Sequence, residues 1–71
     1  MGLIEYESEE QLSREAAAAK LRELADQLAR HNQVAFEREG RRYTVDVPDQ
    51  VTLSYEIEIG EENEIEIEIS W

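Results

Sequence analysis

The closing run Glu64–Trp71, EIEIEISW, constrains the fold more than any other stretch, because Glu or Ser alternates strictly with Ile and a final Trp. Alternation with a period of two is typical of a β-strand that has one apolar face and one polar face. The run Val51–Ile59 alternates in the same way. Both runs therefore predict strands, and we expect their odd-numbered side chains, Trp71 included, to lie in the core.

The sequence GEEN between these runs predicts a hairpin. If Asn63 adopts the left-handed conformation of a three-residue loop, Gly60 pairs with Glu64. That register opposes Ile57 to Ile67, so apolar partners match along one face. On the other face it opposes glutamates, which destabilises a strand pair unless dissolved salt screens the repulsion.

A second pair of alternating runs flanks the turn Glu39-Gly40, in the sequence VAFEREGRRYTVDV. A two-residue turn at this point opposes Phe36 to Tyr43, and Glu37 to Arg42 on the outer face. Apolar residues then pair with apolar residues and an acid with a base, which favours this register.

The sequence VPDQV follows, and Pro48 suits the first central position of a type I turn. Such a turn would join the two hairpins into one sheet. It would oppose three pairs of residues, which are Val47–Val51, Val45–Leu53 and Tyr43–Tyr55.

Between residues 13 and 32 the hydrophobic period changes to that of a helix. Ser13 is a favoured N-cap residue, and Asn32 can adopt the left-handed conformation that ends a helix. Helical spacing aligns an apolar stripe of Ala17, Leu21, Leu24 and Leu28. The pattern predicts one long helix that covers the apolar face of the sheet.

Residues 3–8, LIEYES, predict a short first strand that joins an edge of the sheet. It would lie either beside the second strand, in parallel, or beside the fifth, in antiparallel orientation. The predicted fold is α+β, in the order β-α-β-β-β-β, with an antiparallel meander sheet and one long helix packed on one face. Residues 1–71 are expected to form a single domain.

The chain of 71 residues has 18 acidic and 7 basic residues, a net charge of −11, and no cysteine. Disulfides and cysteine-based zinc sites are thereby excluded, so stability must come from one small apolar core, to which oligomerisation could add. The negative surface disfavours direct binding to nucleic acid. An excess of acid with a single lysine, Lys20, is typical of adaptation to concentrated salt. The alternative is an acidic protein of a mesophile.

No constellation of residues points to chemistry. His31 is the only histidine, and the strand glutamates share a face without converging as calcium ligands must. We therefore expect no catalytic residues, no cofactor-binding residues, no metal ligands, no cofactor and no enzymatic activity. No apolar run is long enough to span a membrane and the start lacks the pattern of a signal peptide, so a cytoplasmic location without membrane contact is expected.

Two function classes remain open. The first is a module that binds another protein or a second copy of itself, through a sheet edge or the outer helix face. The cluster EREGRR, with Arg38, Arg41 and Arg42, would either keep a hairpin tip soluble or contact an acidic partner. Trp71 would be core, or at the rim it would anchor a partner. The second class is a small ligand-binding or enzymatic domain with a pocket between helix and sheet.

The chain resembles the amphi-Trp domain family, small acidic proteins of which many come from halophilic archaea. The resemblance rests on LSREAAAAKLRELADQLA, YTVDVPDQV and EIEIEISW, and it covers nearly the whole chain. It implies a salt-adapted protein and carries over no catalytic residue.

Overall fold

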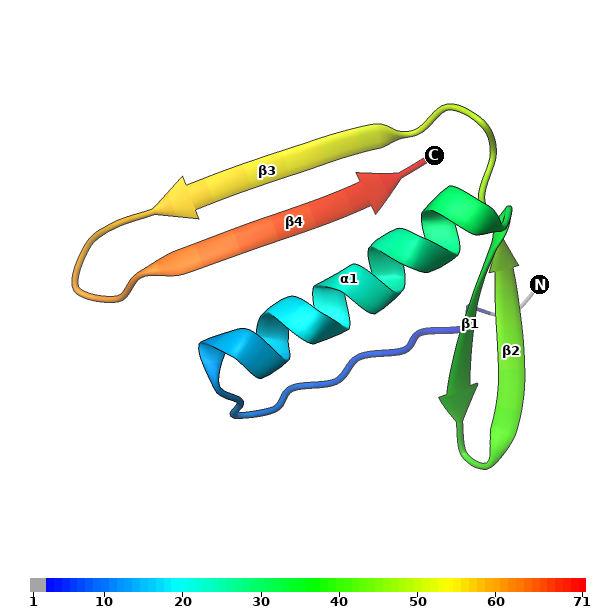
Figure 1. Cartoon of the computed structure of the whole chain (residues 1–71), viewed down its shortest axis with the longest axis horizontal. Coiled ribbons are helices and arrows are strands. Elements are labelled where there is room, and N and C mark those ends of the chain that lie inside the picture. The colour runs from blue at the N-terminus through cyan, green and yellow to red at the C-terminus, as the bar shows by residue number, and fades with distance from the viewer. Residues whose placement is uncertain (1–2) are drawn as a thin grey trace.

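A computed structural model describes residues 3–71 of the chain (Figure 1). One helix is followed by four strands, in the order α1 (Arg14–Arg30), β1 (Gln33–Arg38), β2 (Arg41–Asp46), β3 (Thr52–Glu58) and β4 (Glu64–Ser70). The strands pair in sequence as two antiparallel hairpins, β1–β2 and β3–β4. The predicted α+β class, the long helix and the four antiparallel strands after it are confirmed.

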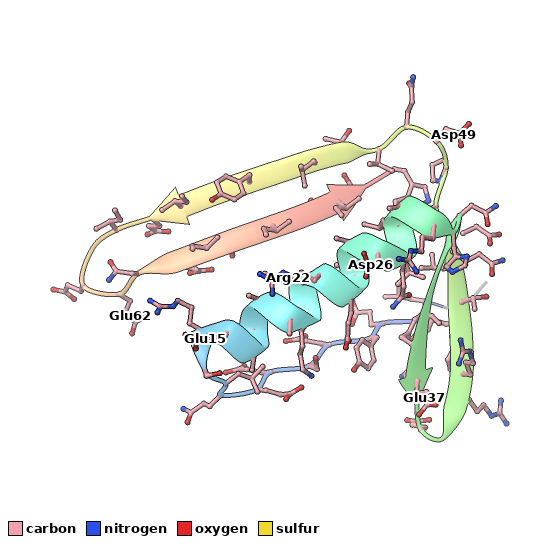
Figure 2. The ribbon with its side chains drawn as sticks, viewed as in Figure 1. Glu15, Arg22, Asp26, Glu37, Asp49 and Glu62 are labelled. Atoms are coloured by element: carbon pink, nitrogen blue, oxygen red, sulfur yellow. The ribbon has the colours of Figure 1, made fainter. Side chains whose placement is uncertain are left out.

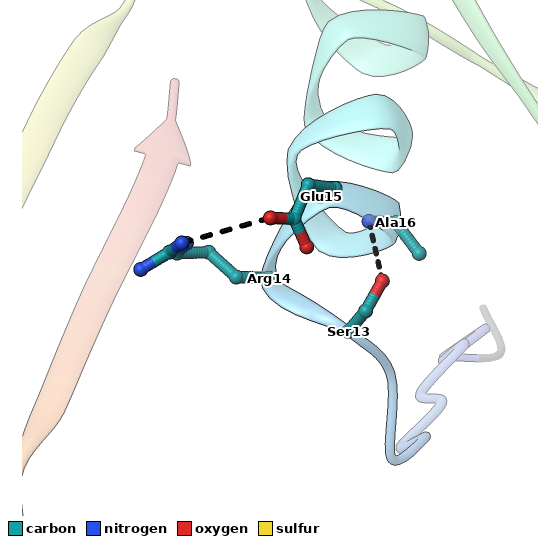
Figure 3. A network of polar contacts seen from close by, with 4 residues as sticks. All are labelled: Ser13, Arg14, Glu15 and Ala16. Atoms are coloured by element: carbon teal, nitrogen blue, oxygen red, sulfur yellow. Dashed lines mark hydrogen bonds and ion pairs between the residues drawn. The ribbon is translucent and has the colours of Figure 1, made fainter.

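Helix α1 begins as the sequence predicts. The hydroxyl of Ser13 accepts a hydrogen bond of 3.0 Å from the backbone N–H of Ala16, which satisfies a donor that the first turn leaves free (Figure 3). Glu15 adds an acid in the first turn, where the helix dipole favours it. The helix ends at Arg30 with His31 as the C-cap, in an extended conformation. The predicted left-handed conformation of Asn32 is not found, since Asn32 has no positive φ.

Hairpin β1–β2 has the predicted register, with Phe36 opposite Tyr43 and Glu37 opposite Arg42. Its turn places Glu39 at φ 53° and Gly40 at φ 75°, the two left-handed residues of a tight hairpin turn. The two opposed rings stack, with 5.4 Å between their centroids. Local turn chemistry and a matched cross-strand pair thus determine this hairpin.

The predicted strand at residues 3–8 is not formed, because residues 3–13 have no strand pairing. The segment runs back along the helix and is held there by side chains (Figure 1). The ring of Tyr6 lies 5.4 Å from that of Phe36. Lys20 donates a hydrogen bond of 2.6 Å to the carboxylate of Glu10, which raises the pKa of Lys20. An aromatic contact and an ion pair therefore hold the N-terminal segment in place, where pairing with another strand was predicted.

Hairpin β3–β4 has a register two residues away from the predicted one. Ile57 lies opposite Ile65 instead of Ile67. The cause is the loop, because Asn63 does not have the left-handed conformation that a three-residue loop requires. Its side-chain oxygen instead accepts a hydrogen bond of 3.3 Å from the backbone N–H of Gly60, within a wider loop. A shift by two keeps every side chain on its predicted face.

The predicted single meander is corrected to two separate two-stranded sheets, since β2 and β3 do not pair. No backbone hydrogen bond closes a turn across residues 47–51. The N–H of Val47 instead donates to the carbonyl of Asn32 at 2.7 Å, which extends the ladder on the β1 side. The chain leaves β2 at this point, and the hairpins lie at a steep angle to each other (Figure 1).

The second hairpin lies alongside helix α1, at a distance from the helix backbone (Figure 1). Helix α1 contacts β1, and the described residues show no comparable backbone approach between α1 and either β3 or β4. The Cα radius of gyration is 14.1 Å, whereas a compact chain of this length would have about 11 Å. The single chain is therefore expanded for its size.

Candidate functional site

The most distinctive surface is an apolar groove of about 310 Å³ between helix α1 and both hairpins. We call it the apolar groove. Its walls are Leu21, Leu24 and Leu28 of α1, Val34, Val45 and Val47 of the first hairpin, and Ile67, Ile69 and Trp71 at the end of the chain. The helical stripe and the odd-numbered positions of β4 therefore meet on one surface, as their periodicity predicts.

The groove is open to solvent, and here the prediction of a closed core is wrong. None of the residues 3–71 is fully buried. Trp71 is 61% exposed, Leu21 53% and Ile67 48%. The sequence orients these side chains correctly, but within one chain nothing covers them.

A wider apolar hollow of about 840 Å³ adjoins the groove and shares five lining residues with it: Leu24, Val34, Val45, Ile69 and Trp71. Ile4 and Tyr6 of the N-terminal segment line it, together with Phe36 and Tyr43 of the first hairpin. Groove and hollow thus form one continuous apolar surface.

The opposite face of the second hairpin carries five glutamates, which we call the glutamate face: Glu56, Glu58, Glu64, Glu66 and Glu68. Glu56 lies opposite Glu66, and Glu58 opposite Glu64. A hydrogen bond with the neighbouring carboxyl of Glu64, and its negative charge, raise the pKa of Glu66. Crowded like charges thus make one glutamate hold its proton more tightly than usual.

All four strands have an unpaired edge in the described residues. Each sheet has two strands, so each strand has one ladder and one edge without a partner strand, those of β2 and β3 included. The edge of β2 begins with Arg41 and Arg42, beside the hairpin turn. Unpaired edges present free N–H and C=O groups that another strand can bind.

Charged side chains lie around the molecule rather than in the groove. Figure 2 shows Glu62 in the loop of the second hairpin and Glu37 toward the tip of the first, at opposite sides of the view. Within residues 3–71 there is no group of three or more acidic or histidine side chains arranged to hold a metal ion. His31 contributes its backbone N–H to the helix end, donating 2.9 Å to the carbonyl of Gln27.

The chain was also compared with known proteins. The sequence profile of the Amphi-Trp domain matches residues 2–71. The chain belongs to the Amphi-Trp family. Neither the curated proteins nor the solved structures contain a match. Across the part of this Amphi-Trp domain that the structure describes, no helix is long and apolar enough to cross a membrane.

The hydrophobic periodicity of the sequence predicts every residue that lines the groove, but it predicts them as parts of a closed core. The available signal was chain length, because a domain of 71 residues without cysteine has little capacity to bury two hairpins and a helix. The tilted aromatic contact between Tyr6 and Phe36 was not predicted, since the N-terminal segment was assigned to a strand.

Proposed function

We propose that this Amphi-Trp domain is a non-enzymatic protein-interaction module that binds another polypeptide chain through the apolar groove and the adjoining strand edges. The observation that supports this most is the amount of apolar surface left exposed by the single chain. Eight of the positions predicted as core in the two long strands are more than one-third exposed: Val51, Leu53, Tyr55, Ile57, Ile59, Ile65, Ile67 and Trp71.

The accessible surface of the chain is 7043 Å². A folded monomer of 8.3 kDa would expose about 4,600 Å² by the usual scaling of surface with mass. The chain thus buries only about 40% of its extended-chain surface, compared with about 60% for a typical small domain. Exposed apolar surface on this scale marks a site that another molecule covers.

The composition of the groove favours a protein partner over chemistry on a substrate. Every residue that lines it is apolar, and none carries an ionisable side chain. General acid–base and nucleophilic catalysis need a titratable or nucleophilic group directed at the substrate. The groove offers area and shape, which are what a hydrophobic interface uses.

A second candidate function is binding of a small apolar ligand. It is favoured by the volume of about 310 Å³, which lies at the lower end of the range for ligand sites. The groove lacks the few polar groups that normally orient a ligand. Mass spectrometry of an organic extract of the purified protein tests this candidate, which requires one compound in stoichiometric amount.

We also propose that the domain works in concentrated salt in the cytoplasm, without direct contact with nucleic acid or membranes. The net charge of −11 and the opposed glutamates Glu56 and Glu66 support this, because salt screens their repulsion. The melting temperature should then rise with KCl concentration, and a flat dependence would contradict salt adaptation.

Photo-crosslinking in cells that naturally produce the protein tests the interaction function. A benzophenone amino acid replaces Ile67, which lines the groove, or in a matched control Glu68, the next residue on the opposite face. We expect the Ile67 position to form one discrete protein adduct, and the Glu68 position to form much less of it. Equal adducts from both positions, or none from Ile67, would overturn the proposal.

A further inference from the structure

The unpaired edge of β3 is directed away from the rest of its own chain. In Figure 1, β4 lies between β3 and helix α1. The apolar groove agrees with this arrangement, because Ile67 and Ile69 of β4 line it and no residue of β3 does. The free edge of β3 is therefore accessible to another molecule.

The structure also holds β2 apart from β3 of the same chain. The hydrogen bond of 2.7 Å from Val47 to Asn32 fixes the end of β2 against the β1 side. Pro48 follows directly and disfavours a helical turn conformation at Val47. Short links of this kind, between two elements that would otherwise pair, favour exchange of the elements between copies.

The sequences of β2 and β3 are nevertheless complementary. In the antiparallel register that the sequence predicts, Tyr43 opposes Tyr55 and Val45 opposes Leu53 on the apolar face. On the outer face Arg42 opposes Glu56, an attractive cross-strand pair.

Self-pairing of β4 or of β3 between two copies is less favourable. Pairing of two β4 strands about Ile67 would oppose Glu66 of each copy to Glu68 of the other, which is repulsive. Pairing of two β3 strands about Tyr55 would oppose Glu56 to Ser54 and would form no ion pair. Of these three pairings, β2–β3 is the one that sets Tyr43 and Val45 opposite apolar partners and Arg42 opposite an acid.

We propose that a second copy of this chain occupies the interaction surface, with β2 of each copy adding to the free edge of β3 of the other in a two-fold symmetric dimer. This inference rests on the proposed interaction function and identifies its partner. Each half then contains a four-stranded antiparallel sheet in the order β1, β2, β3, β4, with the first two strands from one copy and the last two from the other.

The exposed area suits this assembly. The surface of 7043 Å² exceeds that of a folded monomer of the same mass by about 2,500 Å². A standard interface takes about 800 Å² from each partner, and obligate dimers take more. The area that each copy would bury by exchanging strands and covering the groove falls within that range.

A charge-exchange experiment tests the proposal by sedimentation equilibrium in about 0.15 M salt, where cross-strand charges still interact. Arg42→Glu and Glu56→Arg each place like charges at both β2–β3 contacts of the dimer. Each purified variant alone should dimerise about tenfold or more weakly than the parent protein. An equimolar mixture should recover the parent affinity, since each variant supplies the charge that the other lacks.

The mixture separates exchange between copies from closure within one chain. If β2 paired with β3 of its own chain, mixing would restore nothing, while the double variant Arg42→Glu, Glu56→Arg would fold normally. Dimers that Arg42→Glu leaves unaffected would point to a β3–β3 contact. Either result overturns the proposed pairing, as would a parent protein that stays monomeric.

Far-ultraviolet circular dichroism of each variant shows whether it folds. A variant that unfolds alone and refolds on mixing also supports the proposal, because only a chain of the other kind supplies the matching charge. A heterologous adduct at position 67 in the crosslinking experiment, without a self-adduct, would support the interaction function and overturn the dimer.

Discussion

The two hairpins have similar lengths and the same alternating pattern, yet among the described residues only the first is anchored by side chains to the rest of the chain. The first is tied to the helix, where the side-chain oxygen of Gln27 accepts a hydrogen bond of 3.1 Å from the N–H of Ala35. Phe36 and Tyr43 pack with Tyr6 beside it. The second hairpin has no hydrogen bond or ion pair to the helix among those of residues 3–71, and its two faces remain largely exposed.

The difference teaches that alternation fixes which face a strand presents, and that contacts nearby in the sequence fix where the strand lies. The first hairpin follows the helix after a link of two residues, so tethers such as Gln27 to Ala35 close small loops at low entropic cost. The second hairpin joins through residues 47–51, and its own side chains find no such tether. In the proposed dimer, the second hairpin pairs with the first hairpin of a second copy.

Removal of the Phe36 ring should give the largest difference in stability effect between the two hairpins. Phe36→Ala deletes a half-buried ring that contacts both Tyr6 and Tyr43. We expect the free energy of unfolding to fall by about 2 kcal/mol, less than for a fully buried ring. Urea unfolding at micromolar concentration measures this.

The matched control is Ile59→Ala at the end of the second hairpin, where the side chain is 84% exposed. It should change the free energy of unfolding by no more than about 0.5 kcal/mol. Equal losses from the two variants would show that both hairpins share one core, contrary to the comparison.

The next largest difference in stability effect is expected between glycine substitutions in the loops of the two hairpins. Gly40 has φ 75° and Gly60 does not have a positive φ, while neither position would bring an added Cβ into a clash. Gly40→Ala should therefore cost about 1 kcal/mol from backbone strain alone. Gly60→Ala should be neutral or stabilising by up to about 1 kcal/mol, through lower entropy of the unfolded chain.

Thermal unfolding of the two glycine variants measures both effects. A loss at Gly60 as large as the loss at Gly40 would mean that the second loop is as tightly specified as the first.

The smallest expected effect comes from charge. The pKa of Glu66 is raised above its ordinary value of 4.5 by Glu64, so the folded protein binds this proton more tightly than the unfolded chain. The resulting stabilisation is fully present below pH 4.5 and is lost as the pH rises through the raised pKa. Glu64→Gln should therefore raise the melting temperature at pH 7, by less than about 3 °C, and the gain should vanish in acid.

The control in the first hairpin should have the opposite sign. Glu37→Gln removes an acid that lies opposite Arg42, so it should lower the melting temperature slightly at pH 7. A stabilising Glu37→Gln would show that net charge alone, rather than the pairing in each hairpin, governs both responses. Added KCl should diminish both differences.

Much of this fold was predictable from the sequence, for reasons that particular residues make clear. Ser13 marks the helix start and Glu39-Gly40 the first turn, because each supplies local chemistry that its position requires. The face of Ile67 follows from alternation alone. The exact register of β3–β4 does not, since Ile57 meets an isoleucine whether its partner is Ile65 or Ile67.

The candidate site was only half predictable, since its residues follow from periodicity and its exposure does not. Trp71 has the same pattern in the sequence whether its own chain or another covers it. Coverage depends on the position of the second hairpin, which the five residues 47–51 join to the first hairpin. The N-terminal segment was mistaken for a strand because Tyr6 alternates like a strand residue, although its ring packs against Phe36 instead.

Sedimentation equilibrium of the parent protein in molar KCl, from micromolar to millimolar concentration, tests most directly whether a second copy covers the exposed apolar surface. One chain has a mass of 8.3 kDa. We expect the weight-average mass to reach about twice that value at the higher concentrations and to stop there, as closed two-fold symmetry requires. A mass that stays at 8.3 kDa throughout the range would contradict the proposed dimer.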